Sequence, residues 1–217
     1  SQCPNFMVFE RAIRAWALGP SSVRAATRAT HMLRLFQQQQ QQQQKQSSCS
    51  YSTIVPTKTF TCVIRAWALL GNKNTAETAE SLLEEMEERY QTNKLNRNKL
   101  NKNKNTVLVD QDGGKPNLIT YSTVIDAWAK SGSKDAGTRA QAILDKMTKK
   151  SKHDPSIHPN EFCYGAVMDA WAKCKRPDKA QALLERMPPH YANTLVYTSV
   201  VDAWAKSGNK KAGEMAE

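Results

Sequence analysis

One short pattern recurs five times along the chain and limits what the chain can fold into. In its clearest copy, Tyr121-Ser-Thr-Val-Ile-Asp-Ala-Trp128-Ala-Lys, an aromatic residue is followed seven positions later by a tryptophan within Ala-Trp-Ala. The other copies begin at Phe9, Phe60, Tyr164 and Tyr197, and all five tryptophans of the protein occupy this one position. Such regularity indicates an internal repeat, so we expect a chain built from repeated structural units.

Each copy has the spacing of two amphipathic helices joined by a turn. The first helical face carries apolar residues at i, i+3, i+4 and i+7, namely Tyr121, Val124, Ile125 and Trp128. The second carries Ala140, Ile143, Leu144 and Met147. Gly132 lies between the two, where a residue that adopts a positive φ at little cost can end the first helix. Because neither stripe can be buried alone, the predicted fold is all-α, an α-solenoid of stacked helix-turn-helix repeats.

Segments of biased composition interrupt the repeats. Gln37 to Gln44 is an unbroken glutamine tract, and Asn93 to Asn105 is mostly Asn, Lys and Arg. Such compositions bury little apolar surface, so we expect disordered low-complexity inserts. The predicted order is repeat 1 over 5–36, a Gln/Ser-rich insert over 37–55, repeat 2 over 56–89, an Asn/Lys-rich insert over 90–115, repeat 3 over 116–149, a polar loop over 150–158, repeat 4 over 159–188 and a truncated repeat 5 over 192–217. The incomplete last repeat leads us to expect a fragment of a longer protein.

The charge of the chain favours an anionic partner. The chain has 31 Lys and Arg residues against 20 Asp and Glu residues, for a net charge of +11. This excess suits nucleic acid or an anionic membrane surface. No apolar run is long enough to span a membrane, and no single helix is both strongly basic and strongly apolar, as binding to a membrane surface would require. A nucleic-acid partner is therefore one interpretation of the charge, and simple solubility is the other.

The residue types that carry most enzyme chemistry are scattered. Five cysteines without a Cys-x-x-Cys motif indicate a reducing compartment, with neither a disulfide framework nor a zinc site. They are Cys3, Cys49, Cys62, Cys163 and Cys174. The four histidines lack the spacing of metal ligands, and no Ser/His/Asp arrangement or glycine-rich phosphate loop is present. We therefore expect no enzyme activity, no metal and no cofactor.

The stretch from Lys115 to Gly132 resembles a known repeat. It reads Lys-Pro-Asn-Leu-Ile-Thr-Tyr-Ser-Thr-Val-Ile-Asp-Ala-Trp-Ala-Lys-Ser-Gly, which is similar to the pentatricopeptide pattern of Lys-Pro-Asp, two apolar residues, Thr-Tyr-Asn, a later Asp, an aromatic residue and Lys-x-Gly. The Ala-x-x-Leu-Leu-x-x-Met of the second helices in copies two and four also fits this pattern. The tetratricopeptide signature, with Trp near the start and then Leu-Gly and Tyr, does not fit. Repeats 3 to 5 resemble the pentatricopeptide pattern best.

This resemblance implies a sequence-specific reader of single-stranded RNA, with one base for each repeat. In the family, the residue after the first aromatic and the last residue of the same repeat contact one base edge. The corresponding residues here are Thr61 with Asn117, Ser122 with Asn160, Gly165 with Asn193, and Thr198. Family usage pairs Ser or Thr and Asn with adenine, whereas Gly165 has no side chain and should discriminate weakly. The structural alternative for Asn117 and Asn160 is ordinary N-capping of a helix.

The resemblance also implies contacts with neighbouring bases and with phosphates. Apolar residues two positions before the aromatic, Ile119, Phe162 and Leu195, would sandwich bases, and their structural alternative is packing at the helix entry. Lys130, Lys173 and Lys206 follow Ala-Trp-Ala and would form a column suited to a phosphate backbone. Leu18 and Leu69 replace the lysine in repeats 1 and 2. The tryptophans share a helix face with apolar residues, so we interpret them as core rather than as stacking platforms.

The function implied by the family is post-transcriptional. It would be RNA processing, stability or translation in a mitochondrion or plastid. The alternative from a different class is a protein-protein interaction scaffold that uses the solenoid surface. The lysine column and the polar pairs favour RNA over that alternative.

Overall fold

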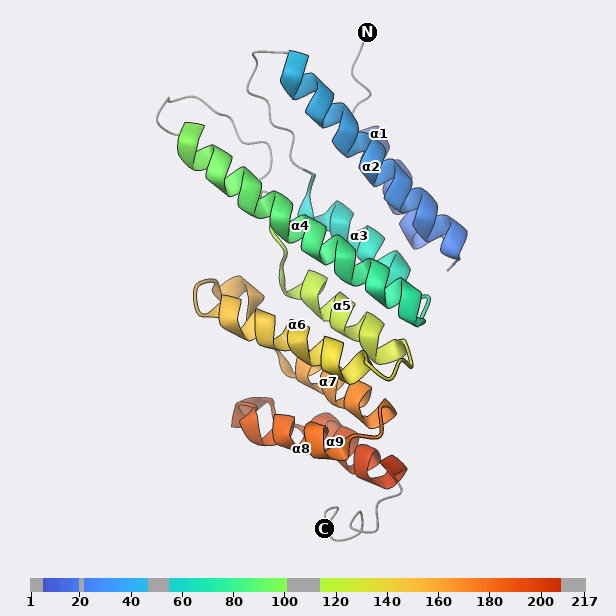
Figure 1. Ribbon diagram of the computed structural model, residues 1–217, viewed down its shortest axis with the longest axis vertical. Coiled ribbons are helices and arrows are strands. Elements are labelled where there is room, and N and C mark those ends of the chain that lie inside the picture. Colours follow the sequence, from blue (N-terminus) through green and yellow to red (C-terminus); the bar gives the residue numbers. More distant parts are fainter. Residues whose placement is uncertain (1–5, 20–21, 47–54, 101–113, 208–217) are drawn as a thin grey trace. The chain divides into compact units, whose positions relative to one another are not determined.

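The computed structural model describes residues 6–19, 22–46, 55–100 and 114–207. Within these ranges the protein is helical, without a β-strand (Figure 1). The elements are α1 (Phe6–Leu18), α2 (Val23–Gln46), α3 (Thr57–Ala68), α4 (Lys73–Leu100), α5 (Leu118–Lys130), α6 (Ala136–Ser151), the 3₁₀ helix η1 (Pro155–Ile157), α7 (Glu161–Lys173), α8 (Pro177–Arg186), the 3₁₀ helix η2 (Pro189–Tyr191) and α9 (Thr194–Ser207). The predicted all-α helical repeat fold is confirmed.

The helices group into two compact units. Unit 1 comprises residues 1–70 and 80–116, and unit 2 comprises residues 71–79 and 117–217. In unit 1, α1 and α2 form a hairpin, and α3 packs against both helices. Its core contains the buried side chains of Ile13, Leu33, Phe36, Phe60, Val63 and Ile64. The Trp67 indole Nε1 on α3 donates a hydrogen bond to Thr30 Oγ1 on α2 at 2.8 Å, which ties the first helix of one repeat to the second helix of the previous one.

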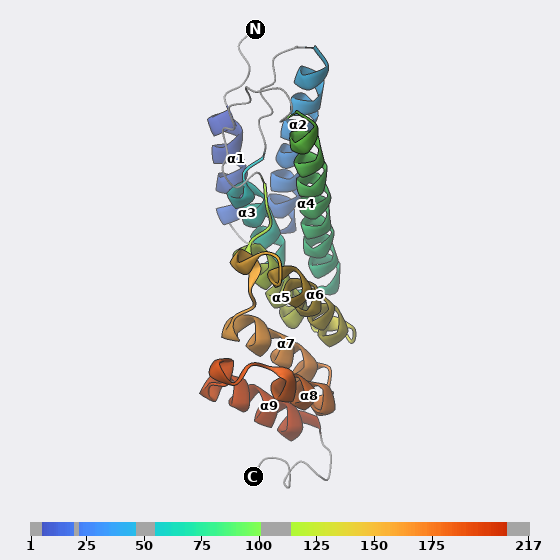
Figure 2. The same cartoon turned by 90° about the vertical axis from the view of Figure 1, so that its left-hand side faces the viewer.

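Unit 2 stacks the best-matching repeats. The hairpins α5–α6 and α7–α8 follow one another, and α9 packs against both α7 and α8 (Figure 2). Each first helix of a repeat therefore contacts the first helix of the next, and α6 and α8 each contact the first helix that follows. The buried core of this unit includes Tyr121, Val124, Ile125, Leu144, Met147, Val167 and Met168. These are the apolar stripes that the sequence predicts.

The turns within the two hairpins of unit 2 each contain a residue with a positive φ, but only one of these residues is a glycine. Gly132 follows α5 with a φ of +63°, which confirms its expected conformation. In the next hairpin Lys175 takes the same place with a φ of +56°. The left-handed region costs a non-glycine residue about 1–2 kcal/mol, so stacking of the hairpins must compensate for this strain.

The tryptophans are core residues in unit 2 but not throughout. Trp128, Trp171 and Trp204 are buried, which confirms their interpretation as core residues. Trp16 is 38% exposed, and the Arg28 guanidinium lies 4.6 Å from the centroid of its ring. The core interpretation is therefore wrong for Trp16. Trp171 and Trp204 each donate to the second helix of the preceding repeat, whereas the ring of Trp16 contacts Arg28 on α2, the second helix of its own hairpin.

The low-complexity segments differ from the expected disorder. Helix α2 continues through the glutamine tract to Gln46, and α4 continues into the Asn/Lys-rich segment as far as Leu100. Gln, Lys and Arg are good helix formers, and a nucleated helix extends at little further cost, which explains the continuation. Residues 47–54 and 101–113 of the two inserts lie outside the described residues.

One close approach between helices depends on the absence of a side chain. A Cβ atom added to Gly137 on α6 would overlap the ring of Trp171 on α7. Gly165, in contrast, lies in α7 with no heavy atom within 4 Å of an added Cβ. The packing of α6 against α7 therefore requires a glycine at position 137, whereas position 165 has room for a side chain.

The substitution Gly137→Ala should lower the free energy of unfolding by about 1–3 kcal/mol, because the methyl group displaces the Trp171 ring. The matched control Gly165→Ala should raise it by about 0.5–1 kcal/mol, because alanine restricts the unfolded chain and fits the helix. Thermal unfolding followed by circular dichroism would show shifts of opposite sign. Equal shifts for the two variants would contradict the packing of Trp171 over Gly137.

Candidate functional site

The three first helices of unit 2 begin with an asparagine cap. Asn117, Asn160 and Asn193 directly precede α5, α7 and α9. Each Oδ1 accepts a hydrogen bond from a backbone N–H three residues later, at 3.1 Å from Thr120, 3.2 Å from Cys163 and 3.1 Å from Val196. The capping interpretation is therefore correct for Asn117 and Asn160, and Asn193 caps α9 in the same way, so local physics alone accounts for the position of all three residues.

Capping leaves part of each carboxamide available. The Oδ1 contact fixes the orientation of the amide group, so Nδ2 points away from the helix end with two N–H donors. In the part of the chain that the structure describes, these nitrogens have no protein acceptor. The side chains are partly or fully exposed. A cap asparagine can thus stabilise its helix and still donate to a ligand.

An apolar side chain follows two residues after each cap. Ile119 is 63% exposed and Phe162 is 51% exposed, so neither packs into the core. The alternative of packing at the helix entry is wrong for these two residues. Leu195 has the same position in α9, and its side chain lies outside the described residues. Ile119 and Phe162 therefore offer apolar surface to solvent next to the cap donors.

The residue five positions after each cap completes the set. Ser122 Oγ donates to the Ile119 carbonyl at 3.1 Å, and Thr198 Oγ1 donates to the Thr194 carbonyl at 2.6 Å. Gly165 has no side chain at this position. Thr61, in unit 1, donates to the Thr57 carbonyl at 2.8 Å. Because the hydroxyl proton is bound within the helix, the oxygen presents mainly its lone pairs to a ligand.

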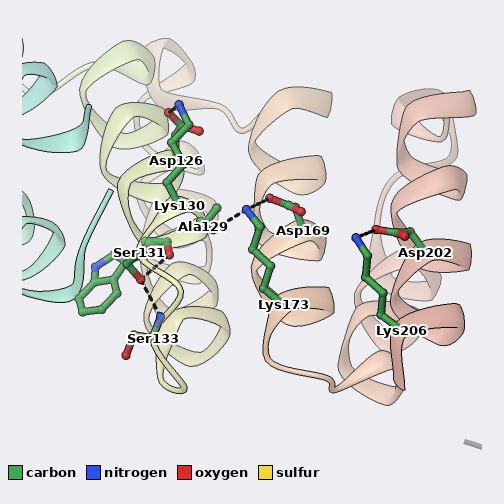
Figure 3. A network of polar contacts seen from close by, with 10 residues as sticks. Asp126, Ala129, Lys130, Ser131, Ser133, Asp169, Lys173, Asp202 and Lys206 are labelled. Atoms are coloured by element: carbon green, nitrogen blue, oxygen red, sulfur yellow. Dashed lines mark hydrogen bonds and ion pairs between the residues drawn. The ribbon is translucent and has the colours of Figure 1, made fainter. Parts of the chain in front are cut away.

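The predicted lysine column is paired with acids. Lys130, Lys173 and Lys206 each form an ion pair with an aspartate four residues earlier, namely Asp126, Asp169 and Asp202 (Figure 3). Lys173 Nζ also donates to the Ala129 carbonyl of α5 at 2.8 Å, which joins two successive repeats. The aspartates were not among the predicted site residues. Their signal is the recurring Asp-Ala-Trp-Ala-Lys, which places opposite charges one helical turn apart.

These pairs moderate the positive charge of the column. The hydrogen bond and charge of Asp202, with the more distant charge of Asp169, raise the pKa of Lys206, so this ammonium group stays charged at neutral pH. The lysine side chains are 40–58% exposed. Exposed pairs of this kind hold together weakly, so an anion can compete for the ammonium donors. The column can bind phosphate, but only in competition with its own carboxylates.

Hydrogen bonds between repeats keep these helix starts in register. Trp171 Nε1 donates to Gln141 Oε1 at 2.8 Å, and Trp204 Nε1 donates to Gln181 Oε1 at 3.2 Å. Both glutamines directly follow an alanine of the preceding second helix, at equivalent positions. This feature was also missed from the sequence, where the Ala-Gln-Ala sequence of α6 and α8 was its only sign. The two bonds make the same residue set recur along unit 2.

The described residues contain no cluster of three or more His, Cys, Asp or Glu residues that could hold a metal ion. Within the same ranges, none of the helices is both long and apolar enough to cross a membrane. The helix starts of unit 2 therefore remain the candidate functional site.

The comparisons with known proteins agree with the repeat pattern. The family model described as PPR repeat, the pentatricopeptide repeat, matches residues 162–188. This range runs from the first turn of α7 to the end of the α8 hairpin, and it includes Phe162, Gly165 and Lys173. No curated protein matches the chain.

Cys163 reports on the packing at the start of α7. Burial raises the pKa of its thiol to about 11. Since the thiolate is the reactive form, iodoacetamide at pH 8 should modify Cys163 far more slowly in the folded protein than in urea, and its rate should rise as the pH approaches 11. Peptide mass spectrometry can follow this, with the half-buried Cys62 and Cys174 as internal controls. Equal labelling of Cys163 in the folded and unfolded protein would show that this helix start is open.

Proposed function

The chain belongs to the pentatricopeptide repeat family, and we propose that it binds single-stranded RNA with the first helices of its repeats. The family consists of helical repeat proteins that bind RNA. The specific proposal is that this chain reads bases in sequence and acts on an RNA transcript. The residues of unit 2 carry the argument.

A single observation supports this proposal most strongly. The starts of α5, α7 and α9 carry a cap asparagine, then an apolar residue two positions on, then a small or hydroxyl residue five positions on. Asn117, Ile119 and Ser122 form the first set, Asn160, Phe162 and Gly165 the second, and Asn193, Leu195 and Thr198 the third. Donors, acceptors and apolar surface that recur in register suit a polymer whose bases also recur.

The chemistry of one pair of residues from neighbouring sets suits an adenine. Ser122 in α5 offers an acceptor, and the cap Asn160 of the next repeat offers N–H donors. The edge of adenine presents an N–H donor beside a ring nitrogen acceptor, so the two groups are complementary. Gly165 with Asn193 has only the donor and would discriminate weakly. Thr198 and Thr61 carry the same hydroxyl and are proposed to act as Ser122 does.

Neighbouring groups would hold the strand in place. The exposed Ile119 and Phe162 would lie against base faces, as apolar stacking is tolerant of sequence. Lys130, Lys173 and Lys206 would bind phosphates after partly releasing their aspartates. The family resemblance extends the proposal to processing, stability or translation of a transcript in a mitochondrion or plastid.

Base reading can be separated from helix capping by one substitution. Asn160→Asp retains an N-cap oxygen, so the thermal stability should change little, but it replaces the amide donors by a carboxylate. We expect the parent protein to prefer single-stranded adenine-rich RNA over other homopolymers and duplexes. The variant should lose affinity for polyadenylate by roughly five- to a hundredfold, because the donor to the base is lost.

Asn160→Ala is the matched control for stability, since it removes the cap as well and should cost about 1 kcal/mol. An unchanged preference for polyadenylate in Asn160→Asp would rule out base reading at this residue. Failure of the parent to bind any single-stranded RNA at moderate salt would favour the protein scaffold instead.

The lysine column can be tested by substitutions with opposite effects. Changing Lys130, Lys173 and Lys206 together to Ala should weaken RNA binding and reduce the slope of log K against log salt by about 2, since three phosphate contacts are lost. Changing Asp126, Asp169 and Asp202 to Asn retains the lysines and removes their competitors, so binding should strengthen. Affinities and salt slopes that are the same in all three proteins would exclude the column from the interface.

A further inference from the structure

An aromatic cluster in unit 2 lies beside the cap residues and has no part in the proposal above. The ring centroids of Tyr164 and Tyr191 are 5.8 Å apart in a stacked arrangement, and those of Tyr191 and His190 are 4.0 Å apart. The ring of His158 lies 6.3 Å from that of Tyr191, and its Nδ1 is 3.4 Å from the Tyr191 hydroxyl. We call these four residues the ring cluster.

The ring cluster runs from the core to the surface. Tyr164 is 7% exposed, Tyr191 is half-buried, and both histidines are exposed. The two imidazole rings of the cluster are therefore exposed to solvent, and the two tyrosine rings lie between them and the core. A cluster that served only to pack the two loops together would have no need of exposed rings at its outer end.

The position of the ring cluster matches the repeat. His158 lies two residues before the cap Asn160, and Tyr191 lies two residues before the cap Asn193. The two rings thus come from equivalent positions of successive repeats, in the loops that lead into α7 and α9. A strand bound at these caps would therefore lie near the two loops.

One basic side chain, that of Arg186, acts on the buried end of the cluster. The charge of Arg186 reaches Tyr164, where it lowers the pKa of a phenol that burial foremost raises. Arg186 is 65% exposed at its side chain and forms only a loose ion pair with Asp145, at 3.7 Å. A basic side chain in the same region as exposed aromatic rings suits a nucleotide, which carries a flat base and a negatively charged phosphate.

We propose that the ring cluster is an additional stacking site for one unpaired base of the bound RNA, separate from the bases read at the caps. This proposal depends on the proposed RNA binding. The base stacks on the exposed imidazole of His190, whose ring centroid is 4.0 Å from that of Tyr191, and the exposed guanidinium of Arg186 is available to its phosphate. Stacking tolerates any base, so the site contributes affinity without sequence preference.

The test uses the full chain and single-stranded polyadenylate that contains 2-aminopurine, whose fluorescence falls when it stacks. His190→Ala and Tyr191→Ala should each weaken binding roughly five- to a hundredfold, as expected for one stacked base, and should restore part of the fluorescence. Tyr191→Phe keeps the ring and should bind like the parent. His153→Ala, an exposed histidine in the loop after α6 without a ring contact among the described residues, is the matched control.

Melting temperatures separate a structural role from stacking. His190 is exposed, so His190→Ala should melt like the parent, and its loss of affinity would then support the site. If the parent binds RNA while His190→Ala and Tyr191→Ala bind it equally well, the stacking site is wrong and RNA binding by the repeats stands. If the parent binds no single-stranded RNA, both proposals are wrong.

Discussion

Packing of Trp171 and Trp204 against the preceding second helix is the interaction on which unit 2 depends. The Trp171 ring occupies the space that a side chain at position 137 would need, and its Nε1 donates to Gln141. Trp204 repeats the hydrogen bond with Gln181. Burial of the indole supplies most of the stabilisation, and the hydrogen bond selects its orientation, because a buried N–H without an acceptor is costly. As both contacts arise at the same place in the repeat, successive first helices start at matching positions.

Because the first helices start at matching positions, equivalent side chains recur along the surface of unit 2. An N-cap asparagine is a property of one helix end, but Asn117, Asn160 and Asn193 recur in phase because their helices are held in phase. The same carboxamide then serves stability through its oxygen and offers its nitrogen to a ligand. Exposed Ile119 and Phe162 recur for the same reason. A chain of separate helices with identical sequences would present none of these groups in a line.

The net charge of the chain overstates how positive the surface of α5, α7 and α9 is. The net charge of +11 suggests an unopposed basic face. On α5, α7 and α9, however, each lysine of the column lies beside an aspartate of its own helix. Such a surface attracts a polyanion less strongly than the composition implies, and its binding would depend on exchange between carboxylate and phosphate partners. In the proposed complex with RNA, recognition would therefore rely more on the helix starts than on bulk charge.

The amino-acid sequence by itself determined the all-α repeat, the apolar stripes of each hairpin and the conformation of Gly132, because helical periodicity and turn chemistry are local properties. It also gave the candidate site residues of repeats 3 to 5 equivalent positions in the repeat. It did not reveal that the glutamine tract continues α2, since composition does not show whether a helix has already been nucleated upstream. Only the tertiary structure decided which tryptophans are buried, which second helix holds them, and that Tyr191 meets His158 and Tyr164. Those outcomes depend on which surfaces of distant segments come into contact, and no local pattern contains that information.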